Sequence, residues 1–156
     1  MQLDDIDLLI LSRLRNQARA SWVQVASGLG LSRQTVAERV QRLEEAGVIQ
    51  GYATLVNPEA VGAALAAFVA VTVDRPEQCS GFLAEVERMD EVLECHHIAG
   101  DDSYLLKVRT SSTRGLESLI TEGLKGIAGV VRTRTTIVLS TSKETPHPPL
   151  KGRRPH

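Results

Sequence analysis

The sequence predicts an α+β protein with two domains: three short helices first, and then elements in the order β-α-β-β-α-β. Apolar residues recur at helical spacing in the first fifty residues, and apolar β-rich runs alternate with helical patterns between residues 65 and 142. The 156 residues suit one medium domain or two small ones. We therefore expect domains at 1–50 and 65–142, a linker at 51–64 and a tail at 143–156.

Bulk composition excludes several protein classes. The chain is 42% hydrophobic and 24% charged, as globular proteins are, so it is not disordered as a whole. It contains no apolar run of about 18 residues, which a membrane helix requires. Its acidic start, "MQLDDIDLLI", lacks the basic region of a signal peptide, so we expect a cytoplasmic protein. Cys79 and Cys95 are too few for a disulfide framework or a cysteine-rich zinc site.

The first two helices have recognisable boundaries. Asp4 is a good N-cap for the first helix, and Asp7 lies in its first turn, where a negative charge suits the helix dipole. Ser21 is placed to cap the second helix, "WVQVASGL". Gly30 ends that helix in the manner of a left-handed C-terminal glycine.

The third helix, "RQTVAERVQRLEEAG", is predicted between a Ser32 cap and Gly47, and its two faces differ. Its apolar stripe is Val36, Val40 and Leu43, and its polar positions are Gln34, Glu38, Gln41 and Arg42, flanked by Arg33, Thr35 and Arg39. Two short helices joined by a tight turn, the second polar outside, form the helix-turn-helix pattern. Gln, Arg and Glu can bond adenine, guanine and cytosine, so this face has base-reading chemistry. The alternative is a solvated face on an ordinary three-helix bundle.

The segment "GLGLSRQTVAERVQRLEEAGVIQGY" resembles the DNA-binding segment of the Lrp/AsnC (feast/famine) transcription regulators. The matching positions are Gly30, Leu31, Ser32, Val36, Arg39, Arg42, Leu43, Glu44, Gly47 and Ile49. The resemblance implies a winged-type helix-turn-helix domain whose third helix enters the major groove. Net charge is only −1, so contacts to DNA depend on local arginines. The implied DNA-binding residues are Ser32, Arg33, Gln34, Thr35, Glu38, Arg39, Gln41 and Arg42, of which Arg39 has a structural ion pair as its alternative role.

The second half begins with a connection and then alternates strands and helices. "GYATLV" has a short β pattern, and Asn57-Pro58 is a turn signal, so we expect a connecting strand and then a break. Strands are expected at "LAAFVAVTV", "VLECHHIAG", "YLLKVRTS" and "VVRTRTTIVLSTS", and helices at "PEQCSGFLAEVERMD" and "TRGLESLITEGLKGI". This order is the ferredoxin-like arrangement. Its helix-free face, expected to be rich in Val, Ile and Leu, needs cover, so a homodimer is expected.

The stretch "ECHHIAGDDSYLLKVR" is the central hairpin of this predicted sheet, with its turn at Asp101–Ser103 after Gly100. Side chains alternate along a strand, so Cys95 and His97 face one side, whereas Glu94, His96 and Ile98 face the other. Adjacent histidines therefore cannot share one metal ion, and two ligands do not make a site. We expect neither a metal nor another cofactor.

The same stretch resembles the signature of the ligand-binding half of the Lrp/AsnC family. Positions Glu94, Cys95, His96, Gly100, Asp101, Tyr104, Leu105, Leu106 and Lys107 match, whereas Ser103 stands where the family usually has Asp. The resemblance implies an amino-acid effector at a subunit interface. A Gly-Asp turn offers a carboxylate for an ammonium and N–H groups for a carboxylate. The implied effector-binding residues are His97, Gly100, Asp101, Asp102, Ser103 and Tyr104, with Thr133, Thr135 or Thr136 of a neighbouring subunit.

The leading interpretation is a sequence-specific DNA-binding regulator modulated by an amino acid, not an enzyme, with homodimers assembling to an octamer or similar. One alternative is an enzyme like the sirohaem decarboxylases, which use this layout and place His residues near a tetrapyrrole, as His96 and His97 permit. The polar third helix and the single tryptophan, Trp22, argue against it. A DNA architectural protein without ligand is a third possibility, which Ser103 permits. The basic, proline-rich tail is predicted to be disordered.

Overall fold

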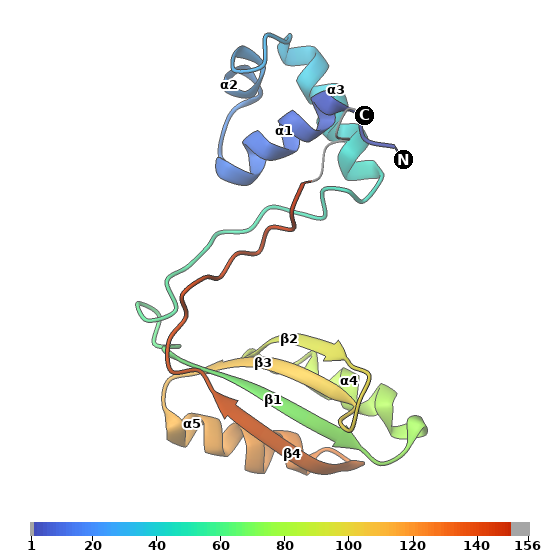
Figure 1. Ribbon diagram of the computed structural model, residues 1–156, viewed down its shortest axis with the longest axis vertical. Coiled ribbons are helices and arrows are strands. Elements are labelled where there is room, and N and C mark those ends of the chain that lie inside the picture. The colour runs from blue at the N-terminus through green and yellow to red at the C-terminus, as the bar shows by residue number, and fades with distance from the viewer. Residues whose placement is uncertain (1, 151–156) are drawn as a thin grey trace. The chain divides into compact units, whose positions relative to one another are not determined.

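A computed structural model describes residues 2–150 and divides the chain into two compact units. The first unit contains the residues up to Leu55 together with the segment from Lys143, and the second unit is Val56–Ser142. Figure 1 shows helices alone as the regular elements of the first unit, and a sheet with helices in the second. Among the described residues, no helix is long and apolar enough to cross a membrane.

The first unit consists of α1 (Asp5–Asn16), α2 (Trp22–Ser27) and α3 (Arg33–Glu45). All three predicted N-caps are confirmed, because the side chains of Asp4, Ser21 and Ser32 each accept a hydrogen bond from a backbone N–H three residues ahead. Gly30 and Gly47 both have φ +67°, the left-handed conformation expected where α2 and α3 end. Both helices lie within the predicted segments and end earlier, at Ser27 and Glu45.

One apolar cluster joins the three helices. It includes Ile10 and Leu14 of α1, Val25 of α2, and Val36 and Val40 of α3, all of which are buried. The predicted stripe of α3 is therefore its inward face, and its polar positions are left outside.

The prediction of a connecting strand at "GYATLV" is wrong. Residues 51–56 are exposed and contain no β-strand. A β pattern forms a strand only where a neighbouring strand accepts its hydrogen bonds, and this segment has no such neighbour within residues 2–150.

The second unit has the predicted order β-α-β-β-α-β. It contains β1 (Leu65–Val73), a 3₁₀ turn η1 (Pro76–Gln78), α4 (Cys79–Val86), β2 (Val92–His97), β3 (Tyr104–Thr110), α5 (Thr113–Ser118) and β4 (Val130–Ile137). After α5, the chain continues through a π-helical turn, η2 (Leu119–Gly123), and a 3₁₀ turn, η3 (Leu124–Gly126). The strands are antiparallel in the order β2-β3-β1-β4, which confirms the ferredoxin-like prediction.

The helices cover one face of the sheet, and the core of the unit lies there (Figure 1). The inward residues of β1 and β3 pack against Phe82 of α4 and Leu116 of α5. These inward residues are Ala67, Val69, Val71, Leu106 and Val108, each of which is fully buried.

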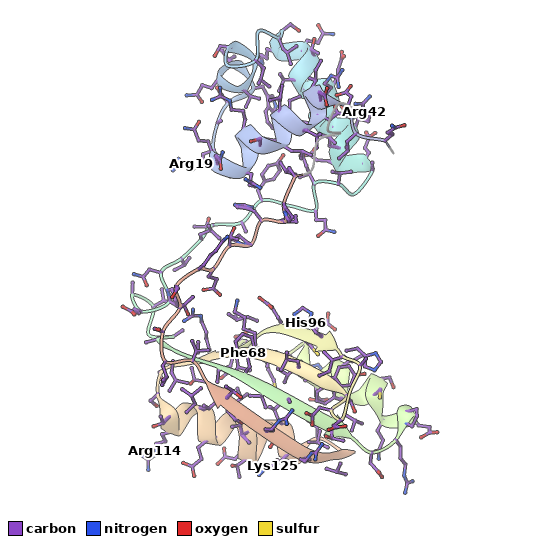
Figure 2. All side chains as sticks on the ribbon, in the orientation of Figure 1. Arg19, Arg42, Phe68, His96, Arg114 and Lys125 are labelled. Carbon is purple, nitrogen blue, oxygen red and sulfur yellow. The ribbon has the colours of Figure 1, made fainter. Side chains whose placement is uncertain are left out.

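The other face, called the open face below, is not covered by a helix of the described chain, and its predicted composition is wrong. Strand alternation places the valines on the inward face, so the open face is mixed rather than rich in Val, Ile and Leu. Phe68, 39% exposed, lies on it with His96, on the side of the sheet opposite Arg114 and Lys125 (Figure 2). Register places Ala70, Thr72, Glu94, Leu105, Lys107, Arg109, Arg132, Arg134 and Thr136 on the same face.

Residues 143–150 of the predicted disordered tail form neither helix nor strand. One hydrogen bond, from Arg15 Nη1 to the carbonyl oxygen of Pro148 at 3.2 Å, joins this segment to α1. Residues 151–156, which were also predicted to be disordered, lie outside the described residues.

Candidate nucleic-acid interface and ligand loop

The outer face of α3 carries the predicted base-reading residues in exposed positions. Gln34 donates to Glu38 at 3.0 Å, and Gln41 donates to Glu45 at 2.8 Å, so both amides take part in pairs between successive turns of the helix. Arg33 is exposed on the first turn, and Arg42 lies on the last turns of α3 (Figure 2). This face therefore presents hydrogen-bonding groups that a partner can approach.

Ser32 and Thr35 have structural roles at the start of α3. Ser32 Oγ accepts a hydrogen bond from the backbone N–H of Thr35 at 3.0 Å and lies 2.8 Å from Thr35 Oγ1. The two hydroxyls are held where the first free N–H groups of the helix point outward, which is a favourable place for an anion.

A buried aspartate of α1 holds two arginines of α3. Asp7 is fully buried, and its carboxylate accepts from Arg39 Nη1 at 2.7 Å and from Arg42 Nη2 at 2.9 Å. Arg39 Nη1 also donates to Asp4 at 2.7 Å. The hydrogen bond from Arg39, together with that from the Asp7 backbone N–H, lowers the pKa of Asp4. The same carboxylates raise the pKa of Arg39.

The position of Asp7 was predictable as a helix-dipole residue, but its partners were not. The sequence placed Arg39 at the edge of the core, and the structure gives it the ion pair that was its alternative role. Arg42, 51% exposed, combines an ion pair with an outward position. A second acidic residue one helical turn after the Asp4 cap was the available signal for this cluster.

The predicted ligand loop between β2 and β3 is anchored to the end of β1. The backbone N–H of Ser103 donates to the carbonyl oxygen of Val71 at 2.9 Å, and its hydroxyl accepts from the N–H of Val73 at 3.1 Å. Gly100, the first residue of the loop, has φ +143°, a conformation that residues with side chains rarely adopt. This conformation explains why the signature has a glycine at this position. Ser103 thus fixes the backbone of the loop against the end of β1.

The two aspartates of the loop differ in their surroundings. Asp101 is exposed, whereas the carboxylate of Asp102 is almost fully buried. Asp102 accepts from Thr72 Oγ1 at 3.0 Å, from Arg132 Nη2 at 3.1 Å and from Arg134 Nη2 at 2.7 Å. The hydrogen bond from Thr72 lowers the pKa of Asp102, and the charges of Arg134 and Arg132 lower it further.

Arg132 and Arg134 were not among the predicted site residues. Arg132 Nη2 also donates to the carbonyl oxygen of Asp101 at 3.3 Å, so it contacts the loop directly. The Arg-Thr-Arg sequence of β4 was the available signal, because residues two apart in a strand share a face.

The remaining predicted ligand residues do not all converge on the loop. The rings of His97 and Tyr104 lie with centroids 5.2 Å apart, and Tyr104 is buried. Thr133 is in register with Val71 beside the loop, whereas Thr135 lies farther along the same face. Thr136 lies on the open face, in register with Phe68.

The predicted division of the β2 side chains is confirmed by register: Cys95 lies opposite Leu106 of the inward face, and His96 opposite Leu105. Glu94 lies 3.1 Å from His96 Nε2 and 3.0 Å from Lys107 Nζ, and these two partners lower its pKa. Within residues 2–150, no group of three or more His, Cys, Asp or Glu side chains is arranged to hold a metal ion.

Comparison with protein families identifies both halves of the chain. Residues 66–148 match the Lrp/AsnC ligand binding domain. Residues 3–50 match a winged helix-turn-helix DNA-binding domain. The two matches correspond to the unit with the ligand loop and the unit with α3.

Characterised relatives match nearly the whole chain. The HTH-type transcriptional regulator LrpA of Mycobacterium tuberculosis is 45% identical over 139 residues, which cover 89% of this chain and 91% of that protein. The leucine-responsive regulatory protein of Salmonella typhimurium is 40% identical over 145 residues, covering 92% and 88%. By name, the first is a transcriptional regulator and the second is a regulatory protein that responds to leucine.

Solved structures of regulatory proteins also superpose on nearly the whole chain. A transcriptional regulator of Neisseria meningitidis, in complex with L-Met, superposes with a TM-score of 0.90 at 30% identity, covering 95% of this chain and 97% of that one. A feast or famine regulatory protein of M. tuberculosis, complexed with L-methionine, gives a TM-score of 0.86 at 43% identity, covering 94% and 98%.

Proposed function

The chain belongs to the Lrp/AsnC family of DNA-binding transcription regulators, and from this premise we propose that it reads specific DNA sites through the outer face of α3 under the control of an amino acid. The observation that carries the DNA-binding part is the exposed row of Gln34, Glu38 and Gln41, opposite a fully buried apolar stripe. Side chains of these types discriminate base edges in the major groove.

The residues of α3 divide into two roles. Arg33, Gln34, Glu38 and Gln41 are the base readers, because they are exposed and their partners lie on the same helix. Ser32, Thr35 and Arg42 contact phosphates at the ends of this face, while Arg39 braces α3 against α1. Phosphate contacts set affinity and orientation, and base contacts set specificity.

Substitution of Gln34 tests this proposal. Gln34→Ala removes a bidentate base contact, and we expect the preference for a selected DNA site over unrelated DNA to fall by about 1–3 kcal/mol. Gln50→Ala, the same truncation at an exposed position after α3, is the matched control and should keep the parental preference. Equal site preference in the parent and Gln34→Ala would remove α3 from the role of reader.

The effector is proposed to bind at the loop Gly100–Tyr104. The exposed Asp101 carboxylate suits an ammonium group, and the N–H groups around Gly100 suit a carboxylate. The methionine complexes of the two structural relatives support an amino acid as the class of ligand. Thr133 lies beside this loop, and the ring of His97 lies next to that of Tyr104. Thr135 and Thr136 are proposed to contact the effector bound to a neighbouring subunit. Calorimetric titration of the full-length protein with each free amino acid tests the proposal, and absence of heat for all of them would favour the architectural alternative.

A second copy of the chain is proposed to cover the open face, giving a homodimer that assembles further to an octamer or similar. The support is the exposed Phe68 ring on a sheet face that no helix of residues 2–150 covers. Such a protein acts in the cytoplasm, where its DNA lies. The two relatives named above are regulators, which supports a regulator over the decarboxylase alternative.

A further inference from the structure

We propose that Asp7 is a positioning residue for DNA binding: its buried carboxylate holds the Arg42 guanidinium so that the outward edge of that group meets a DNA phosphate. Asp7 belongs to α1 and does not lie on the reading face, so it acts on the phosphate contact through Arg42, while its ion pair with Arg39 braces α3. The inference rests on the proposed phosphate contact of Arg42, and it adds the residue that orients that contact.

The hydrogen bonds of the cluster leave one edge of Arg42 available. Within residues 2–150, the hydrogen bonds of Arg42 to Asp7 all come from Nη2, at 2.9 Å and 3.0 Å. Its side chain is 51% exposed, whereas the Asp7 side chain is 1% exposed. A guanidinium has five N–H donors in a rigid fork, so one edge can bind the carboxylate while another faces solvent.

The charges of the cluster make this arrangement tolerable beside DNA. Two carboxylates, of Asp4 and Asp7, stand against two guanidiniums, of Arg39 and Arg42. Both Asp7 oxygens are engaged, by the arginines and by the Asp4 backbone N–H at 3.2 Å. The Asp7 carboxylate therefore faces the interior and the cation of Arg42 faces outward, which is the orientation that attracts a phosphate.

Fixing the side chain before binding strengthens the contact. A long surface arginine samples many rotamers, and it loses that freedom when it binds a phosphate. An Arg42 side chain already held by Asp7 loses less rotamer freedom when it binds a phosphate. A purely structural brace would stabilise the fold without changing how Arg42 responds to DNA, so DNA binding under varied salt distinguishes the two roles.

The experiment uses the full-length protein, a DNA fragment selected by it from a random pool, and a scrambled fragment of equal length. Asp7→Asn should weaken binding to both fragments by the same factor, and the slope of log affinity against log salt should fall by about one, as for a lost phosphate contact. Arg42→Gln should give the same change. Asp5→Asn, which removes the same charge at an exposed position of α1, is the matched control and should keep the parental slope.

A double variant shows whether Asp7 acts through Arg42. Asp7→Asn combined with Arg42→Gln should bind no more weakly than Arg42→Gln alone, since positioning has no effect once its target is removed. Trp22, the single tryptophan, lies in α2, so its fluorescence verifies that the first unit is folded in each variant. If Asp7→Asn unfolds this unit, Arg42→Lys decides: a lysine keeps the charge but has no second edge, so it should show the reduced slope.

The possible failures are separable. No effect of Arg42→Gln on affinity or slope overturns the proposed phosphate contact, and the positioning role with it. A normal effect of Arg42→Gln with Asp7→Asn behaving like Asp5→Asn overturns the positioning role alone. A folded Asp7→Asn that weakens binding as much in the Arg42→Gln background as in the parent, or an Arg42→Lys variant with the parental slope, also overturns it.

Discussion

Each unit of this protein contains one buried aspartate between two arginines, and the two clusters differ in balance. In the first unit, Asp7 holds Arg39 and Arg42, and Asp4 supplies a second carboxylate. The arginine side chains there are 22% and 51% exposed, and the charges of the four groups cancel. This cluster joins α1 to α3, and it therefore fixes the helix that reads DNA in the proposed function.

In the second unit, Asp102 alone holds Arg132 and Arg134, with help from the neutral Thr72 hydroxyl. Both arginine side chains are more exposed, at 58% and 72%, and one positive charge is left over on the open face. The same arrangement, one buried aspartate between two arginines, thus serves two purposes. The balanced cluster holds α1 and α3 together with no net charge left over, while the unbalanced one leaves a net positive charge available to a partner.

The largest effect is expected from breaking the balanced cluster. Asp7→Ala leaves two cations with one exposed carboxylate, and removing one partner of a buried ion pair typically costs about 3–5 kcal/mol. We expect the free energy of unfolding of the first unit to fall by about this amount, as measured by Trp22 fluorescence in chemical denaturation, because that tryptophan reports on this unit. Asp5→Ala, at an exposed position of the same helix, should leave the transition near that of the parent.

The comparison of the two clusters supplies a second control. Asp102→Ala should leave the Trp22 transition unchanged, because Asp102 belongs to the other unit. If Asp7→Ala shifts that transition no more than Asp5→Ala does, the Asp7 cluster is not a stabilising brace.

The next largest effect concerns the partner of the open face. Phe68→Glu places a carboxylate where the proposed dimer buries a ring, and losing that burial costs about 1.5–3 kcal/mol for each copy. Segment 56–142 should therefore become monomeric in sedimentation velocity, whereas the parental segment should be a dimer. Leu83→Glu, at a similarly exposed apolar position on α4, is the matched control and should remain dimeric. A parental segment that is already monomeric, or a dimeric Phe68→Glu segment, would contradict the proposed interface.

The sequence was a good guide to elements and a poor guide to long-range pairs. Caps at Asp4, Ser21 and Ser32, and the order of strands and helices, follow from local hydrogen bonding and periodicity, which act within a few residues. The partners of Asp7 and Asp102 lie about 30 or more residues away in the chain. Local patterns carry no information about such pairs.

The candidate site was predictable to a similar extent. The outer face of α3 follows from helical spacing, so Gln34, Glu38 and Gln41 are exposed as predicted. Along β4, alternation alone separates Thr136 from Thr133, but it does not say which of them meets the loop. The failed strand at 51–56 has the same origin, since a strand depends on a partner that its own residues do not specify.

A smaller effect is expected from acid. The folded-state pKa of Asp102 is lowered, so its contribution to stability is present above the unfolded value of about 3.9 and is lost as the pH falls through the folded value. Segment 56–142 should therefore lose stability in acid, followed by circular dichroism. Asp102→Asn should reduce that loss, while Asp101→Asn, at the exposed neighbour, should keep it. An Asp102→Asn segment with the full parental loss would show that Asp102 does not contribute to the acid transition.

The smallest effect on stability, and the most informative about the site, is expected from Asp101→Asn. The substitution keeps size and turn propensity but removes the charge of an exposed carboxylate. Loss of a charge-assisted hydrogen bond to the ammonium should weaken amino-acid binding by about 1.5–3 kcal/mol in calorimetry, with thermal stability near that of the parent. Asp102→Asn should behave in the opposite way, with a clear loss of stability, because its carboxylate already serves Thr72 and the two arginines of β4.

An analogue of the effector without its α-amino group separates the ammonium contact from the turn. If Asp101 holds the ammonium, the parent should prefer the amino acid to this analogue, and Asp101→Asn should lose most of that preference while binding the analogue as the parent does. If the aspartate only favours the turn, both proteins should show the same preference. Parental affinity and preference in Asp101→Asn would therefore make Asp101 a turn residue. The loop would then rely on its backbone N–H groups and on Arg132, which already contacts the Asp101 carbonyl oxygen, to recognise a ligand.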